Sequence, residues 1–302
     1  MSVILMDGGM GQELLRRSGA RPTPLWSAEV MMREPGLVED LHLDFIRAGA
    51  RTITVNAYSA TRPKLAREGA EDRFEDLQRA ACEAAARARD RSGEDVTITG
   101  CLPPLKASYR PEVTDPLDRI AADYAEIAAL QSPFVDLMLA ETMGSAEEAK
   151  GAAQGAAAAA GKPLWVAWTV EDDGSARLRS GETLADADAA LAGLPVAVRL
   201  LNCSRPEAIT AAMGALAALG GPFGAYANGF SGISDAFQPG GTVDVLEART
   251  DLGPAAYADH AMRWAEAGAA VVGGCCEVGP EHIAELRRRL EAAGHEIKGA
   301  LG

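Results

Sequence analysis

Short β-prone runs alternate with longer helical patterns along the whole chain, and this alternation constrains the fold more than any other feature of the sequence. Eight such runs occur, at residues 3–6, 52–56, 96–100, 135–139, 164–169, 196–202, 223–228 and 270–273. Several are apolar without alternation, as strands buried on both faces must be. Repeated strand–helix units predict a parallel sheet.

The segments between these runs have the marks of helices. Leu37, Leu41, Phe45 and Ala48 fall on one helical face, and helical patterns occupy residues 37–48, 74–91, 146–160, 254–266 and 280–290. Eight units in 302 residues favour an α/β fold of the closed (β/α)8 TIM-barrel type. The alternative is an open doubly wound sheet, but the Gly-Gly-Met-Gly after the first run does not match the phosphate-binding pattern such a sheet should carry. No break in composition suggests a second domain, so residues 1–302 are expected to form one.

Charge and hydropathy limit the partners. The formal net charge of −14 argues against nucleic acid and against anionic membrane surfaces. No apolar stretch approaches the roughly 20 residues that span a bilayer, and the N-terminus lacks the basic region of a signal peptide. We therefore expect a cytoplasmic protein that acts on small molecules. The sequence leaves the oligomeric state open, a homo-oligomer included.

Polar residues and cysteines gather where the predicted strands end. In (β/α)8 barrels the active site lies at this rim. The candidates that follow the predicted strands are Asp7, Tyr58, Cys101, Glu141, Cys203, Asn228, Cys275 and Cys276.

The adjacent pair Cys275 and Cys276 is the most specific of these features. Neighbouring cysteines rarely form a disulfide without strain, so the alternatives are two small buried hydrophobes or a metal site shared with Cys203. Three thiolates suit zinc and leave a fourth position open, as in catalytic sites. Such a centre carries a net charge of −1, which makes it a poor Lewis acid but still ionises an incoming thiol. The pattern predicts alkylation of a substrate thiol.

Two acids on the same rim fit an amino-acid substrate. Asp7 and Glu141 can hold an ammonium group, and backbone N–H groups near Gly8 and Gly9 can take a carboxylate. The alternative for Asp7 is a helix N-cap, and for Glu141 an N-cap or a surface acid.

Two further features bear on a second substrate. Trp26 either packs against a sulfonium or quaternary ammonium ion by cation–π attraction or is an ordinary packing aromatic. The long connection at residues 230–252 is interpreted as a lid or donor-binding loop. Cys101 has no adjacent partner motif, and its role stays open.

The chain resembles homocysteine S-methyltransferases, a family that includes betaine-dependent and S-methylmethionine-dependent enzymes and the homocysteine domain of cobalamin-dependent methionine synthase. The matching segments are residues 6–11, 25–28, 49–58, 141–142, 202–203, 226–228 and 273–276. The resemblance implies a (β/α)8 barrel with Zn²⁺ on Cys203, Cys275 and Cys276. It implies amine contacts at Asp7 and Glu141 and carboxylate contacts near Gly8 and Gly9. It also implies that Asn228 fills the fourth zinc position when substrate is absent. Trp26 and Tyr58 lie in matching segments, and we expect both to bind substrate.

The resemblance further implies the reaction. Zinc-dependent transfer of a methyl group from a sulfonium or quaternary ammonium donor to homocysteine would form methionine. The Leu-Trp-Ser-Ala segment at 25–28 favours S-methylmethionine over betaine as the donor. Three rivals stay open: a zinc hydrolase, which would need histidine ligands; an enzyme that demethylates betaine or a dimethylsulfonio compound; and a non-catalytic zinc- or thiol-binding homologue.

Overall fold

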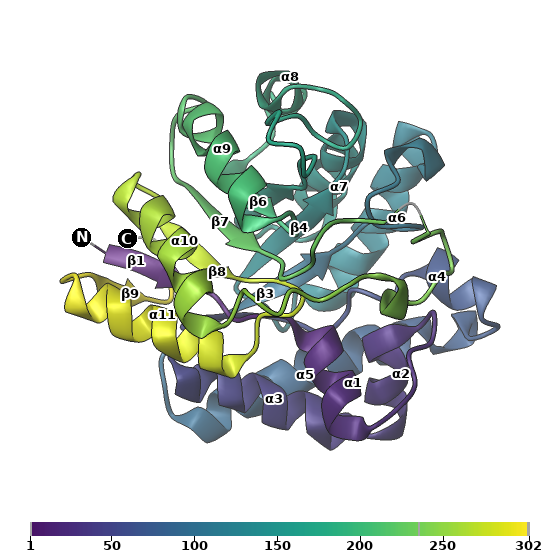
Figure 1. Ribbon diagram of the computed structural model, residues 1–302. Helices are drawn as coiled ribbons and strands as arrows, with labels where there is room; N and C mark the ends of the chain where they lie inside the picture. Colours follow the sequence, from purple (N-terminus) through teal and green to yellow (C-terminus); the bar gives the residue numbers. More distant parts are fainter. Residues whose placement is uncertain (1, 235, 301–302) are drawn as a thin grey trace.

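Nine parallel strands curl into a barrel in the computed structural model, which describes residues 2–234 and 236–300 (Figure 1). The strands run in the order β2-β3-β4-β5-β6-β7-β8-β1-β9. Their bounds are β1 Ser2–Leu5, β2 Thr52–Thr54, β3 Thr97–Leu102, β4 Leu137–Met143, β5 Leu164–Trp168, β6 Val196–Asn202, β7 Phe223–Ala227, β8 Val271–Gly274 and β9 Glu296–Lys298. The predicted eight strands of a (β/α)8 barrel are confirmed, and β9 is an addition.

The barrel closes between β1 and β2 through very few contacts. A single parallel bridge joins Met6 to Thr52. The N–H of Asp7 donates to the carbonyl of Thr52 (3.0 Å), and the N–H of Arg51 donates to the carbonyl of Leu5 (2.9 Å). β9 pairs with the start of β1 beside this junction.

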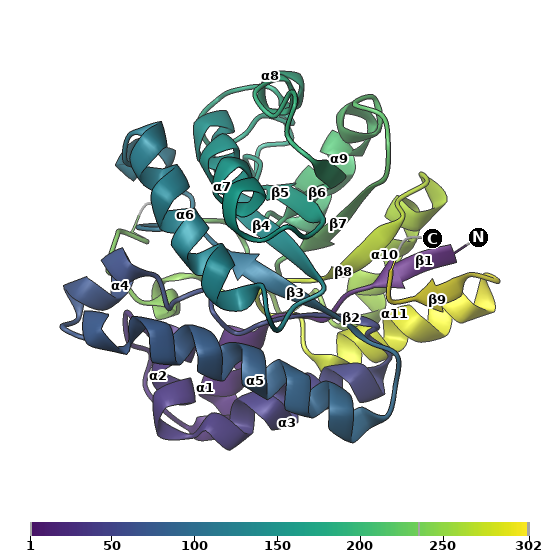
Figure 2. The same cartoon turned by 180° about the vertical axis from the view of Figure 1, so that it is seen from behind.

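Helices surround the sheet on its outside in both views (Figures 1 and 2). They are α1 Met10–Ser18, α2 Trp26–Arg33, α3 Pro35–Ala48, α4 Arg62–Arg67, α5 Phe74–Ser92, α6 Leu117–Gln131, α7 Ala146–Ala159, α8 Leu184–Ala189, α9 Pro206–Ala217, α10 Pro254–Glu266 and α11 Pro280–Ala292. Short 3₁₀ turns occur at Glu71–Arg73, Pro111–Val113 and Val243–Val245. Within the described residues no helix combines the length and apolar character needed to cross a membrane.

Alternation within the strands divides the core into two parts. In β1, Val3 and Leu5 pack in the large cluster between sheet and helices, whereas Ile4 belongs to a second cluster inside the barrel. That inner cluster fills the barrel with side chains and is closed at the site end by Met6 and Tyr226. The site therefore rests on a packed floor rather than on an open channel.

The fourth strand differs from the prediction. It spans Leu137–Met143 instead of residues 135–139, and its pairing with β5 shifts register between Ala140 and Met143. Thr142 at this bulge has φ +60°, a conformation that costs a β-branched residue energy. Asn202 holds it, because its Oδ1 accepts from the Thr142 N–H and its Nδ2 donates to the Thr142 hydroxyl, both at 2.9 Å. The bulge turns Glu141 into the barrel mouth.

Candidate metal centre

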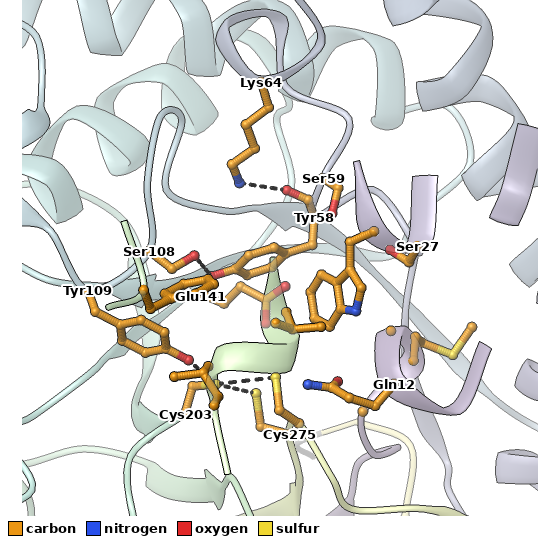
Figure 3. Close-up of a pocket in the computed structure, with 18 of the residues that line it drawn as sticks. Gln12, Ser27, Tyr58, Ser59, Lys64, Ser108, Tyr109, Glu141, Cys203 and Cys275 are labelled. Carbon is orange, nitrogen blue, oxygen red and sulfur yellow. Dashed lines mark hydrogen bonds between the residues drawn. The ribbon is translucent and has the colours of Figure 1, made fainter. Parts of the chain in front are cut away.

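Three cysteines from two strand ends meet at the mouth of the barrel. Cys203 follows β6, and Cys275 and Cys276 follow β8. The sulfur of Cys275 lies 2.8 Å from that of Cys203, the sulfur of Cys276 lies 3.8 Å from it, and all three fall within 4.8 Å of one another. The structure thus brings together the three cysteines that the sequence predicted as metal ligands. Figure 3 shows two of them, Cys203 and Cys275.

Close backbone packing positions the pair. A Cβ on Gly9 would lie 2.5 Å from the carbonyl oxygen of Cys275, and one on Gly8 would lie 2.0 Å from that of Val278. Only glycine permits this approach, so Gly8 and Gly9 have a packing role against the cysteine turn that was not predicted. Cys203 itself has φ +48°, a conformation rare outside glycine that is often found at functional sites.

The protonation of the cluster favours a bound cation. Burial raises the pKa of Cys203, but hydrogen bonds with Cys275, Cys276 and the Tyr109 hydroxyl (3.0 Å) outweigh burial and hold that pKa well below its usual range. The pKa values of Cys275 and Cys276 are raised well above the usual range, first by their hydrogen bonds to Cys203. These shifts favour ionisation of Cys203 and disfavour ionisation of Cys275 and Cys276. Full ionisation of all three requires a compensating positive charge.

The donor set fits zinc. Three soft sulfur ligands at an open cavity match a catalytic zinc site, which keeps one position for water or substrate. Cys203 and Cys276 are buried and Cys275 is half-buried, and all three cysteines belong to the wall of one cavity.

Glu141 lies inside β4, not after it as predicted, and it is neither an N-cap nor a surface acid. Burial raises its pKa to about 7, although the thiol of Cys101 donates a hydrogen bond to its Oε1 (3.0 Å) and opposes the shift. Cys101 likewise lies within β3 rather than after it. Cys101 does not belong to the group of three cysteines, and its thiol instead holds the carboxyl group of Glu141 in place.

Asp7 directs its carboxylate to the neighbouring strand. The N–H of Thr54 donates to Oδ2 of Asp7 (2.9 Å). Burial raises the pKa of Asp7 well above its usual range, and the nearby Glu141 raises it further. The N-cap of α1 is Gly9, so the N-cap alternative for Asp7 is wrong. Two buried carboxyl groups with unfavourable ionisation face one cavity, an arrangement that a cationic ligand would relieve.

The cavity has a volume of about 150 Å³, enough for a small organic molecule. Its wall includes most of the predicted site residues: Asp7, Gly8, Gly9, Trp26, Tyr58, Glu141, Cys203, Cys275 and Cys276. Trp26 begins α2 and meets Tyr58 edge to face, with ring centroids 6.1 Å apart. Tyr58 is held by a hydrogen bond of 2.8 Å between its hydroxyl and that of Ser108.

The connection at 230–252 covers part of this cavity. Residue 235 of this connection lies outside the described residues. Phe230, Phe237 and Leu246 contribute apolar side chains to the cavity wall. The expectation that this segment lies on the site face is confirmed. Asn228 is buried beside it, and its Oδ1 accepts from the N–H of Phe230 (3.2 Å). Asn228 is not among the described residues that form the cavity wall.

Comparison with known proteins identifies the family. The family model for homocysteine S-methyltransferase matches residues 4–290. The chain belongs to this family. The homocysteine S-methyltransferase of Escherichia coli strain K12 is 30% identical over 307 residues, with 95% of each chain covered. Crystal structures of the homocysteine methyltransferase MmuM from Escherichia coli superpose with TM-scores of 0.79 for the oxidised form and 0.78 for the metallated form. Both are 27% identical and cover 96% of each chain.

The cavity wall of this homocysteine S-methyltransferase family member also contains residues that were not predicted from the sequence. Tyr109 comes from the loop after β3, and its hydroxyl contacts Cys203. The sequence offered one indication of this role, which is that Tyr109 is an aromatic residue in a loop that follows a predicted strand. Gln12 and Lys64 lie in the first turns of α1 and α4. Burial lowers the pKa of Lys64 to about 8, and its Nζ donates to the carbonyl of Tyr58 (2.9 Å).

Proposed function

We propose that the chain transfers a methyl group from a sulfonium or quaternary ammonium donor to the thiol of homocysteine, forming methionine, with Zn²⁺ held by Cys203, Cys275 and Cys276. The observation that carries this proposal is the joint placement of three thiols and two buried carboxyl groups around one small cavity. When bound, zinc would ionise the acceptor thiol at neutral pH.

The remaining groups of the site would position the acceptor. Asp7 and Glu141 would hold its ammonium group, since each is buried and lacks a cationic side chain in hydrogen-bond contact among the described residues. The ammonium would favour ionisation of both carboxyl groups. Backbone N–H groups near Gly8 and Gly9 would take the carboxylate, apart from that of Gly9 itself, which donates to the carbonyl of Val278.

The aromatic wall would receive the donor. Trp26 and Tyr58 offer ring faces and edges to a methylated cation beside the sulfur cluster. In the transfer, the bond between the methyl carbon and the donor heteroatom breaks as the acceptor sulfur bonds to that carbon, and the thiol proton is released. The donor leaves as a neutral thioether or amine, so no general acid is required. S-methylmethionine is the favoured donor on the strength of the segment at 25–28.

Further parts of the proposal concern the rest of the chain. Residues 1–302 would act as one homocysteine-binding domain, in the cytoplasm, on small molecules, without nucleic-acid or membrane partners. The segment at 230–252 would cover the donor. Asn228 would fill the fourth metal position when the acceptor is absent, which requires its side chain to turn from Phe230 towards the cluster.

The test combines metal content and turnover. Zinc-loaded protein is assayed for methionine formation from homocysteine with S-methylmethionine, S-adenosylmethionine, glycine betaine, dimethylsulfoniopropionate and methyltetrahydrofolate. Cys203→Ser should lose zinc and activity together. Cys82→Ala is the matched control, because Cys82 is buried in α5 away from the cavity and should keep both. Full activity of metal-free protein, or no turnover with any donor, would refute the proposal.

A further inference from the structure

Gln12 is a partly buried residue of the site whose amide group is buried and leaves its hydrogen-bonding capacity unused. Both amide atoms are shielded from solvent, and neither has a hydrogen-bond partner within residues 2–234 and 236–300. The residue belongs to the cavity wall, and Figure 3 shows its amide directed towards Cys275. A buried amide without partners destabilises the free protein, so a ligand that pairs with it would recover that loss.

The ordinary local role of this glutamine is already filled. Gln12 is the third residue of α1, where a glutamine side chain often bonds back to the N–H of the N-cap residue. Here the N-cap is Gly9, and its N–H donates to the carbonyl of Val278 (2.9 Å). The side chain of Gln12 makes no cap bond and is therefore available to the cavity.

We propose that the Nε2 group of Gln12 donates a hydrogen bond to the carboxylate of the amino-acid acceptor and so selects thiols that carry this group. The inference rests on the proposed function. With the thiol at the three cysteines and the ammonium between Asp7 and Glu141, the carboxylate lies on the side formed by Gly8, Gly9 and the first turn of α1. That turn belongs to a helix of nine residues without a side-chain N-cap, whose first N–H groups attract anions.

The cation Lys64 is placed differently. Its Nζ bonds to the carbonyl of Tyr58 and lies 4.6 Å from the centroid of the Tyr58 ring. In Figure 3, Tyr58 stands between Lys64 and the cysteines. Gln12 is thus an unpaired polar side chain at the acceptor end of the cavity, and it adds no charge next to the sulfur cluster.

The experiment compares two thiols that differ only in the carboxylate. Binding of homocysteine and of 3-aminopropane-1-thiol to zinc-loaded protein is measured by titration calorimetry for the wild type and for Gln12→Met, which keeps the volume but removes both polar atoms. A hydrogen bond to a charged group predicts about ten- to a hundredfold weaker binding of homocysteine. Binding of 3-aminopropane-1-thiol should change less than about twofold. Gln12→Glu should weaken homocysteine more than Gln12→Met does, because like charges repel.

Gln154→Met is the matched control, since it makes the same change on α7 outside the described cavity wall. Zinc content and melting temperature should match the wild type in all variants. Equal losses for both thiols, no loss for homocysteine, or a raised KM for the donor with unchanged homocysteine binding would overturn the inference. If the wild type binds neither thiol, it is the proposed function that fails, and the inference with it.

Discussion

Replacing Glu141 with glutamine should stabilise the protein while weakening its binding of homocysteine. Burial raises the pKa of Glu141 from its usual 4.5 to about 7, so the folded protein at pH 8 holds a carboxylate in an unfavourable place. A rise of this size corresponds to about 3 kcal/mol of folding free energy. Glutamine keeps an oxygen that can accept from Cys101 and carries no charge, so Glu141→Gln should recover that amount.

The contribution of Glu141 to the free energy of unfolding depends on pH. Below pH 4.5 the carboxyl is protonated in both states and contributes nothing. Between 4.5 and 7 the unfolded chain releases its proton while the folded protein retains it, so stability falls as pH rises, and above pH 7 the full loss applies. The variant should therefore be more stable by about 1 kcal/mol at pH 5 and by about 3 kcal/mol at pH 8. For 302 residues the second figure raises the melting temperature by roughly 5 °C.

Urea denaturation and thermal melts at pH 5 and pH 8, paired with homocysteine titrations, measure both effects. Glu148→Gln is the matched control, because burial raises the pKa of Glu148 to about 7 as well, and its Oε2 accepts from the backbone N–H of Gly144 (3.0 Å) outside the main cavity. It should show a similar gain in stability with unchanged homocysteine binding. A gain for Glu141→Gln that does not vary with pH, or unchanged homocysteine affinity, would refute the reasoning.

Three further predictions follow from the same structure. The kcat/KM for homocysteine should fall as pH drops below about 7, because protonated Glu141 no longer pairs with the ammonium group, and Glu141→Gln should remove this dependence. Gly11→Ala should destabilise the protein by about 1–3 kcal/mol in urea denaturation. The reason is that the new Cβ would lie 2.0 Å from the ring of Trp26, whereas Gly36→Ala, with nothing within 4 Å, should not destabilise it. Removing zinc from the zinc-loaded protein with a chelator should abolish methyl transfer and leave the circular dichroism spectrum nearly unchanged, since the sheet is held by strand pairing rather than by the cysteines.

The fold was largely predictable because its strands are apolar and its helices are periodic. The helix at Pro254–Glu266 matches the predicted bounds, and Phe74–Ser92 differs by one residue. The strand β9 was missed because Glu296–Lys298 is short and polar. Its pairing with β1 is a tertiary contact that the local sequence does not indicate. The register shift in β4 was missed because a bulge depends on a tertiary contact, here the one from Asn202.

The site was predictable where chemistry restricts the residue type. Cys203, Cys275 and Cys276 come together as expected, because each follows a strand and the carboxyl ends of the strands share one rim of the barrel. The partner of Glu141 was not predictable, since Cys101 contacts it only through the pairing of β3 with β4. Gln12 carried no signal either, because glutamine is common in the first turn of a helix and only the structure shows that its amide is unpaired.

The weakly joined junction between β1 and β2 gives the barrel an uneven resistance to opening. Most neighbouring strands share several paired residues, but Met6 and Thr52 form the only bridge at this junction among the described residues. Amide protons here, such as those of Asp7 and Arg51, should exchange with solvent sooner than those of β5 and β6. Because Asp7 both crosses the junction with its N–H and faces the cavity with its carboxylate, an acceptor bound to Asp7 would slow that exchange. Occupancy of the site and closure of the barrel are then linked equilibria, each favouring the other.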